Sequence, residues 1–364
     1  MRRLRMGLCG AGLAGQAAHA FFLWEDRERF EFAALLDASP SVRQSLGARY
    51  GIERLCGTMD EFLRCNLDAV VIALPDALHP ECAVEAFDAG LHVLCEKPMS
   101  LTLAGCDRMI TARDRSGRVG QVAYMKRYDP AVRAALEHLP PIEHIRLISV
   151  EVNDPDHEPF VAHLPMTWPN DIPQDLRNSL AAATKTQLDE AADRRMDDEA
   201  RRAFANGFLS AIVHDVAVVH GFINHLGGEL PARADFGARF DGGRGIQLGF
   251  KLKGGARVSM IHLNLPGVPD YRERITVYCD DRIIELVFPS PYLRNSPTRL
   301  TVRRGTGGNT LETAEIRQSY EEAFREELRA FHAAITTGAP VATPFEQARR
   351  DVELLTSAFR STLA

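Results

Sequence analysis

Residues 4–15 read LRMGLCGAGLAG, a short apolar segment that runs directly into three glycines. Residues 16–24 then carry the apolar spacing of a helix. Strand, glycine turn and helix in this order form the dinucleotide-binding fingerprint. In it Gly10 permits the tight turn, Gly12 lets the backbone approach a pyrophosphate, and Gly15 lets the helix pack close to the strand. The predicted cofactor-binding residues of the turn are Gly10, Gly12, Leu13, Ala14 and Gly15.

An acidic residue lies where this fingerprint requires one. A second predicted strand, residues 30–36, ends in Asp37, about 20 residues beyond the glycines. A carboxylate there accepts hydrogen bonds from the adenosine ribose hydroxyls and repels a 2′-phosphate, so NAD is the favoured cofactor. Ser39 and Arg43 are close enough in sequence to hold a phosphate if Asp37 turned away, which keeps NADP as the alternative.

The pattern continues as apolar strands that alternate with helices. Helices are predicted at 40–50, 59–65 and 80–89, and strands near 54–55, 69–74 and 92–95. Such an order indicates a parallel sheet covered on both faces, with ligands at the carboxyl ends of its strands. The strand-end residues predicted to form the cofactor edge are Gly10, Asp37, Leu74, Pro75, Glu96 and Lys97. His79 follows Pro75 and is predicted either to contact the ribose or to start a helix in solvent.

Lys97 is the candidate for chemistry at this edge. It leaves a predicted strand directly before Pro98, and a proline biases the preceding residue towards an extended conformation. An ammonium held there can donate to a reacting oxygen where cofactor and substrate meet. The alternative is a lysine at a strand end that points into water.

Composition narrows the class of protein. The chain has 364 residues, of which 45% are hydrophobic and 25% charged, so it is long enough for two domains with cores of their own. A net charge of -6 without long basic runs argues against a nucleic-acid partner and favours a small-molecule ligand. Seven scattered cysteines without metal-ligand spacing suggest reduced thiols. We found no signal peptide or membrane span and expect a cytoplasmic protein.

Several of these segments together resemble one protein family. They are the glycine turn, Leu74-Pro75 with His79, the run from Ala89 to Pro98 that ends in Glu96-Lys97-Pro98, and Tyr124 to Pro130. The sequence resembles the glucose-fructose oxidoreductase, inositol dehydrogenase and rhizopine-catabolism family (Gfo/Idh/MocA). The resemblance implies an α/β protein. A doubly wound Rossmann sheet is followed by a domain with a large, open, mostly antiparallel sheet.

The second half agrees with that implication. Strand-like segments are predicted at 142–153, 245–253, 256–265, 272–278 and 282–287. We therefore predict a cofactor domain at 1–122 and a substrate and oligomerisation domain at 123–364, whose closing helices are free to pack back on the first domain. An open sheet face that carries Ile261, Leu263 and Leu265 would suit a second copy, so a homodimer or homotetramer is expected.

Residues 154–206 depart from the family pattern. Residues 154–175 are rich in Pro, Asp and His, and residues 176–206 form a strongly charged helical region, interpreted as a solvated helix face. The acidic and histidine residues of the first part lack a fixed ligand spacing, so a loop lining the substrate pocket is favoured over a metal site. Those residues are Asp154, Asp156, His157, Glu158 and His163.

The resemblance also points to a second catalytic residue. His214 matches the family's catalytic histidine, which commonly follows an aspartate four residues earlier, whereas Ser210 stands at that position here. A serine hydroxyl can orient the imidazole but cannot raise its basicity as a carboxylate would. The alternative is a core histidine satisfied by a neighbour. Arg127 and Tyr128 are further candidates for the substrate side, with a structural ion pair as the other reading of Arg127.

The function expected from these observations is an NAD(P)-dependent oxidoreductase that interconverts a secondary alcohol and a ketone on a sugar, amino sugar or cyclitol. Lys97 and His214 would be catalytic, and Lys97, Arg127, Tyr128, Ser210 and His214 would contact the substrate. A diol or enone reductase of the same fold is one alternative. A nucleotide-sensing protein without turnover is the alternative from another class.

Overall fold

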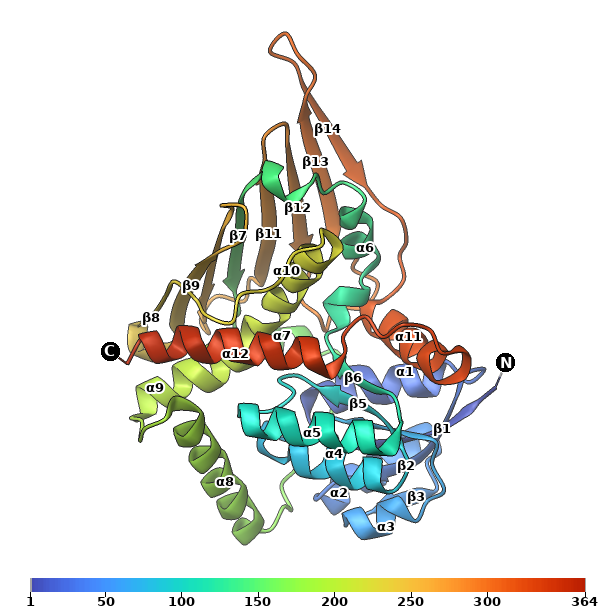
Figure 1. Cartoon of the computed structure of the whole chain (residues 1–364). Helices are drawn as coiled ribbons and strands as arrows, with labels where there is room; N and C mark the ends of the chain where they lie inside the picture. Colours follow the sequence, from blue (N-terminus) through green and yellow to red (C-terminus); the bar gives the residue numbers. More distant parts are fainter. Residues whose placement is uncertain (1, 364) are drawn as a thin grey trace. The chain divides into compact units, whose positions relative to one another are not determined.

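The chain forms two compact units in the computed structural model, which describes residues 2–363 (Figure 1). Unit 1 comprises the chain up to Tyr124, Val161–Gln187 and Phe324–Arg349; the remaining segments, beginning at Met125, form unit 2. The sequence-based domains differ from these units, because residues 161–187 had been assigned to the second domain. Hydrogen bonds from this segment to Gln16 and Ser45 place it in unit 1.

Unit 1 is built on a parallel six-stranded sheet, sheet A. Its order is β3-β2-β1-β4-β5-β6, that of a dinucleotide-binding Rossmann fold. Every position of β4 is buried, as expected for a parallel sheet covered on both faces. The predicted doubly wound sheet is therefore confirmed. The strands are β1 (Leu4–Cys9), β2 (Phe30–Leu36), β3 (Arg54–Cys56), β4 (Ala69–Ile72), β5 (His92–Glu96) and β6 (Gly120–Ala123).

The helices of the first 124 residues follow local sequence signals. Ser39 accepts a hydrogen bond from the backbone N–H of Val42 at 3.2 Å and so caps α2, which ends at Gly51 in the left-handed region with φ of 69°. The helix predicted at 16–24 begins as a π-helix and becomes an α-helix at Ala20. The helices are η1 (Gly15–His19), α1 (Ala20–Glu25), α2 (Pro40–Tyr50), α3 (Met59–Leu63), η2 (Asp76–Leu78), α4 (His79–Asp88) and α5 (Leu103–Ser116).

The later helices include the charged region. A left-handed residue, Asp193 with φ of 58°, interrupts the predicted 176–206 helix. The acidic and basic residues that follow it are exposed, as expected of a solvated face, except Arg201, which is half-buried. The later helices are η3 (Met125–Tyr128), α6 (Pro130–Leu136), η4 (Ile142–His144), α7 (Glu158–Val161), α8 (Gln174–Ala192), α9 (Asp198–Arg202), η5 (Ala203–Ala211), α10 (Val213–His225), η6 (Asp241–Gly243), α11 (Ala323–Thr337) and α12 (Phe345–Ser361).

Unit 2 contains an eight-stranded sheet, sheet B, in the order β14-β13-β12-β11-β7-β10-β9-β8. Only β7 and β10 pair in parallel, so the predicted large, mostly antiparallel sheet is confirmed. Three strands were not predicted. They are β8, β13 and β14; strand β14 is exposed along nearly its whole length, and β8 has no fully buried position. The strands are β7 (Ile145–Asn153), β8 (Phe236–Phe240), β9 (Gly245–Lys251), β10 (Arg257–Leu263), β11 (Arg272–Cys279), β12 (Arg282–Phe288), β13 (Arg299–Gly305) and β14 (Leu311–Ile316).

The two faces of sheet B differ in composition. Along β10 the buried side chains include Met260 and His262, whereas Ile261 points the other way and is 36% exposed. That outer face also carries exposed ion pairs such as Arg274 with Glu151. It is thus a mixed surface, and the dimer or tetramer expected through it stays a prediction.

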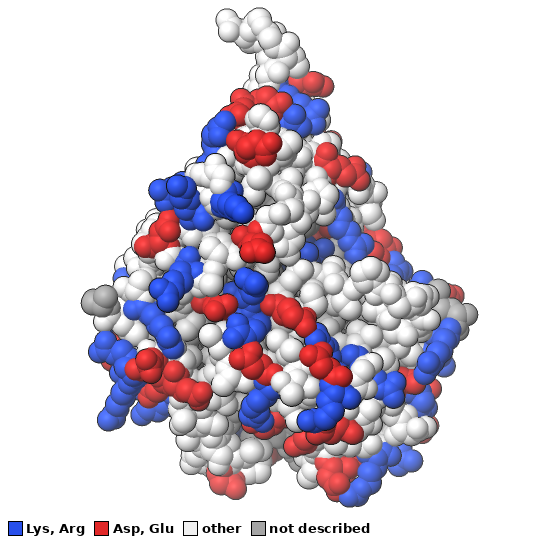
Figure 2. Space-filling view, in the orientation of Figure 1, with Lys and Arg blue, Asp and Glu red and all other residues white. Residues whose placement is uncertain are grey.

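The visible surface carries interspersed charges of both signs (Figure 2). Within residues 2–363 no single helix is long and apolar enough to cross a membrane. The bent pair Asp198–Ala211 and Val213–His225 passes the length and composition criteria only when taken together.

Candidate functional site

The glycine turn has the geometry of a phosphate cradle. Gly10 has φ of 90°, and a Cβ on it would lie 2.4 Å from the carbonyl oxygen of Ala73. A Cβ on Gly15 would lie 2.5 Å from the carbonyl oxygen of Gly10, whereas one on Gly12 would meet no atom within 4 Å. The first and third glycines are thus required for packing, and the space beside the second is open. The first N–H groups of a helix lack intrahelical acceptors and suit phosphate oxygens, and the predicted contacts of Leu13 and Ala14 with the cofactor stay predictions.

Asp37 lies beside this turn, as predicted. Its Oδ2 accepts a hydrogen bond from the N–H of Ala11 at 2.8 Å, and its Oδ1 accepts one from the N–H of Ser39 at 2.8 Å. A carboxylate has about four acceptor sites, so two of them stay available to ribose hydroxyls. Arg43 donates to the main-chain carbonyl of Asp37 and lies next to it.

Glu96 holds the loop that carries Lys97. Its side chain, 10% exposed, accepts from Nε2 of His19 at 2.7 Å and from the backbone N–H of Lys97 at 3.1 Å. Burial disfavours the ionised carboxylate, but the hydrogen bond from His19 and the charges of His19 and Lys97 outweigh it and hold the pKa of Glu96 below its usual value. The Glu96 carboxylate is therefore a support for Lys97, and its predicted cofactor contact stays a prediction.

His79 has a different role from the predicted one. It is fully buried, with Nδ1 at 2.9 Å from the carbonyl oxygen of Pro98 and Nε2 at 2.9 Å from that of Leu74. Both ring nitrogens are thus occupied by main chain, which corrects the predicted ribose contact. The ring instead joins the loop of Leu74 and Pro75, after β4, to the loop of Lys97 and Pro98, after β5.

Glu327 of α11 is a buried carboxyl that the sequence analysis missed. It is fully buried, and neither of its oxygens has a hydrogen-bond partner in the part of the chain that the structure describes. Burial raises the pKa of Glu327 well above its usual value, and the charge of nearby Glu96 adds to that effect. Its position in the apolar phase of an amphipathic helix, between Phe324 and Phe331, was the available signal.

His214 and Ser210 lie on either side of a change in helix type. Ser210 belongs to the π-helix η5, which ends at Ala211, and His214 is the second residue of α10. Both side chains are half-buried. The sequence argument assumed that Ser210 and His214 lie one regular α-helical turn apart. In the structure a junction between a π-helix and an α-helix separates them instead.

Asp215, the residue after His214, belongs to a buried cluster of charged side chains that was not predicted. The ammonium of Lys126 forms an ion pair with Glu273 of β11, and the hydroxyl of Tyr271 donates to the same carboxylate. The carboxyl of Asp215, 1% exposed, lies beside Glu273. Burial raises the pKa of Asp215 well above its usual value, and the charge of Glu273 adds to that effect. The cluster therefore brings the ammonium of Lys126 together with two acidic side chains and a phenol.

One sequence signal could have found this cluster. Glu273 occupies the same buried phase of strand β11 as Ile275 and Val277. A glutamate in the buried phase of a strand requires a partner, because an unpaired buried charge is strongly destabilising. The sequence does not show that the partner is Lys126, which lies 147 residues earlier in the chain.

Arg127 and Tyr128 have structural contacts in unit 2. Arg127 donates to the carbonyl oxygen of Ala217 at 3.1 Å, and a Cβ on Gly221 would lie 2.5 Å from its guanidinium. The absence of a side chain at Gly221 thus lets Arg127 lie across α10. Tyr128 is 1% exposed. Their substrate contacts stay predictions.

The loop after β7 places Asp154 between two imidazoles. Its carboxylate oxygens lie 3.9 Å from Nε2 of His157 and 3.9 Å from Nε2 of His262. No group of three or more His, Cys, Asp or Glu residues within 2–363 has an arrangement suited to a metal ion. The lining of a substrate pocket by this loop stays a prediction.

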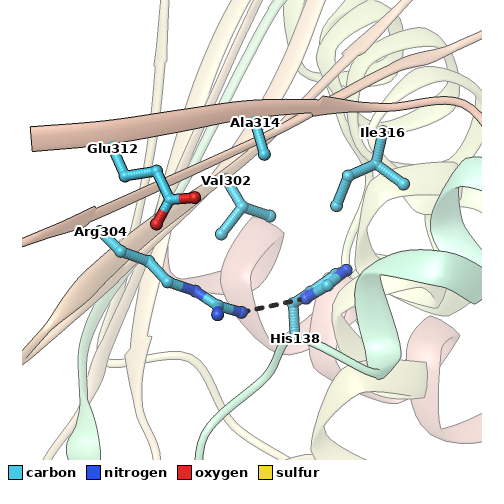
Figure 3. Close-up of a pocket in the computed structure, with 6 residues that line it drawn as sticks. All are labelled: His138, Val302, Arg304, Glu312, Ala314 and Ile316. Atoms are coloured by element: carbon cyan, nitrogen blue, oxygen red, sulfur yellow. Dashed lines mark hydrogen bonds between the residues drawn. The ribbon is translucent and has the colours of Figure 1, made fainter. Parts of the chain in front are cut away.

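A pocket near the far end of sheet B contains none of the predicted site residues (Figure 3). Its volume is about 100 Å³, and Arg304 points to His138 across it at 3.2 Å. Ligand sites usually measure about 300–1,000 Å³. We therefore do not assign a substrate to this pocket.

Comparison with known proteins supports the assignment of a cofactor-binding edge to sheet A. Residues 4–124 match the model of an oxidoreductase family with an NAD-binding Rossmann fold, GFO_IDH_MocA. This part of the chain belongs to the Gfo/Idh/MocA family. The family resemblance of the glycine turn and of Glu96-Lys97-Pro98 is thereby confirmed, and unit 1 contains an NAD-binding domain.

Curated relatives match over the same region. An oxidoreductase of Rhizobium meliloti, ORF334, is 40% identical over 104 residues, 28% of this chain and 31% of its own length. Inositol 2-dehydrogenase 1 of Saccharopolyspora erythraea is 34% identical over 131 residues, 35% of this chain and 39% of its own. The match thus spans about a third of the length of these relatives.

Solved structures extend the likeness in fold to the whole chain. UDP-N-acetylglucosamine 3-dehydrogenase GnnA from Acidithiobacillus ferrooxidans superposes with a TM-score of 0.71 over 100% of this chain and 98% of its own, at 18% identity. At that identity the comparison shows that this chain shares the fold of that protein.

Proposed function

We propose that the protein is an NAD-dependent dehydrogenase that oxidises a secondary alcohol of a sugar, amino sugar or cyclitol to the ketone. The observation that carries this proposal is the position of Lys97. It leaves β5 at the carboxyl edge of the NAD-binding sheet, the edge that also holds Gly12 and Asp37. The names of the relatives, inositol 2-dehydrogenase among them, supply the substrate class.

The residues divide the chemical task between them. Bound NAD supplies the acceptor for the hydride that leaves the carbinol carbon. The Lys97 ammonium donates to the reacting hydroxyl and stabilises negative charge as it develops on that oxygen. His214 takes the hydroxyl proton, for which an imidazole is suited near neutral pH. Glu96 holds the Lys97 loop, and His79 ties that loop to the one after β4.

Incubation of the purified protein with NAD and a panel of cyclitols, sugars and amino sugars tests the proposal. Nicotinamide absorbance should rise with at least one of them. Tight NAD binding without turnover on any compound, including diols and enones tested with NADH, would instead support the nucleotide-sensing alternative.

A further inference from the structure

The segment 161–187 runs along the cofactor edge of unit 1. The N–H of Thr167 donates to Oε1 of Gln16 at 2.9 Å, and Nε2 of Gln16 donates back to the carbonyl oxygen of Thr167 at 2.9 Å. The hydroxyls of Thr167 and Ser45 are 2.7 Å apart. Gln16 directly follows the glycine turn and Ser45 belongs to α2, so the segment is fixed to both sides of the adenosine end of the site.

Asp171 of this segment lies at the N-terminus of α2. Its Oδ2 accepts from the backbone N–H of Ser41 at 2.8 Å, and its Oδ1 accepts from the hydroxyl of Ser39. A helix N-terminus attracts anions through its free N–H groups and its dipole. The hydrogen bond from Ser39 lowers the pKa of Asp171, so the carboxylate is charged at neutral pH.

Ser39 thereby joins two carboxylates. Its N–H donates to Asp37, at 2.8 Å, and its hydroxyl donates to Asp171. Arg43, the neighbouring cation, is bonded to the carbonyl oxygen of Asp37. The hydroxyl of Ser39 and one N–H of Arg43 are thus already engaged, and two carboxylates, Asp37 and Asp171, lie beside the helix N-terminus where a 2′-phosphate would arrive.

We propose that Asp171 is a cofactor-specificity residue, a built-in anion at the α2 N-terminus that excludes the 2′-phosphate of NADP and makes the site selective for NAD. The proposal rests on the cofactor part of the proposed function and is independent of turnover. It also gives a role to segment 161–187, which lies in the part of the sequence that departs from the family pattern.

Binding of NADH and NADPH to the purified full chain, followed by nicotinamide fluorescence, tests the assignment. Asp171→Asn keeps the shape of the side chain and removes its charge. We expect NADPH affinity to rise about tenfold, the order expected for the loss of one like charge near a phosphate, with NADH affinity within about twofold of wild type. Asp175→Asn, an exposed carboxylate of the same segment, is the matched control and should change neither affinity.

The ratio of the two affinities decides the outcome even if the variant loosens the segment and weakens both cofactors. An unchanged NADPH-to-NADH ratio in Asp171→Asn would overturn the proposal. Salt gives an independent measurement, because it screens repulsion between exposed charges. The preference of the wild type for NADH should decrease as salt rises, and that of Asp171→Asn should decrease less. An equal decrease in both would also contradict the role of Asp171.

Discussion

The two residues proposed to act on the substrate each adjoin a buried pair of carboxyl groups, and the two pairs are held in opposite ways. Glu96, before Lys97, bonds to His19, while its neighbour Glu327 has both oxygens without a hydrogen-bond partner among residues 2–363. Asp215, after His214, instead lies beside Glu273, the carboxylate that pairs with Lys126. In unit 1 the second carboxyl, Glu327, thus has no hydrogen-bond partner among residues 2–363, whereas in unit 2 the second carboxyl, Asp215, adjoins the Lys126–Glu273 ion pair.

The largest effect is expected at Lys97 itself. Lys97→Ala removes the donor to the reacting oxygen, so turnover should fall roughly 10²–10³-fold, the usual cost of losing one such donor. NAD affinity should stay within about threefold, because the glycine turn and Asp37 are untouched. Steady-state rates and cofactor titration measure the two quantities. Turnover equal to that of the wild type would remove Lys97 from the chemistry.

The next largest effect is expected at the buried ion pair of Lys126 and Glu273 in unit 2. Lys126→Met leaves the buried Glu273 carboxylate without its cation and should lower the free energy of unfolding by about 3–5 kcal/mol. The double variant Lys126→Met, Glu273→Gln removes both charges and should recover most of that loss. Urea denaturation measures it. Recovery by the double variant no greater than additivity predicts would contradict the pairing.

An exposed pair on the same strand is the control for that experiment. Arg274 of β11 pairs with Glu151 across the outer face, with side chains 47% and 54% exposed. Arg274→Met should cost at most about 1 kcal/mol, as is typical of surface ion pairs.

The carboxyl pair of unit 1 should show opposite pH dependences. The folded-state pKa of Glu96 is lowered, so its contribution to stability is present above about pH 4.3 and is lost as the pH falls through the folded-state value. Glu96→Gln should therefore destabilise the protein at about pH 7, by roughly 1.5–3 kcal/mol for the lost charged hydrogen bonds, and by less at about pH 4.

Glu327 should behave in the reverse sense, with a smaller effect. Its folded-state pKa is raised, so above about pH 4.3 the unfolded chain releases a proton that the folded chain keeps, and stability falls as the pH rises. Glutamine does not titrate. Glu327→Gln should therefore be more stable than wild type at about pH 7 and lose that advantage near pH 4. Thermal unfolding at both pH values is the measurement, and the same shift at both would show that the fold does not raise the pKa of Glu327.

Sequence patterns predicted the cofactor edge because its parts are local. Gly10, Gly12 and Gly15 lie in one turn. Asp37 and Lys97 each follow a strand of the parallel sheet, and the carboxyl ends of parallel strands lie at the same edge. His79 was misassigned, because the two carbonyl groups that occupy its ring belong to loops whose approach depends on tertiary packing.

The sequence predicted the fold of the second unit, but it predicted only part of the candidate site there. Apolar alternation found the central strands of sheet B and missed the exposed β14. The cluster of Lys126, Asp215, Tyr271 and Glu273 draws on three segments far apart in the chain, and no local spacing records their meeting.

The central claim is that the chain transfers hydride from a carbinol carbon to NAD. The most direct measurement uses the polyol that turns over, deuterated at its carbinol carbons, and determines the deuterium content of the NADH formed by mass spectrometry. The account predicts one deuterium on each nicotinamide and slower turnover than with the unlabelled compound when the hydride step limits the rate. NADH formed without deuterium would contradict it.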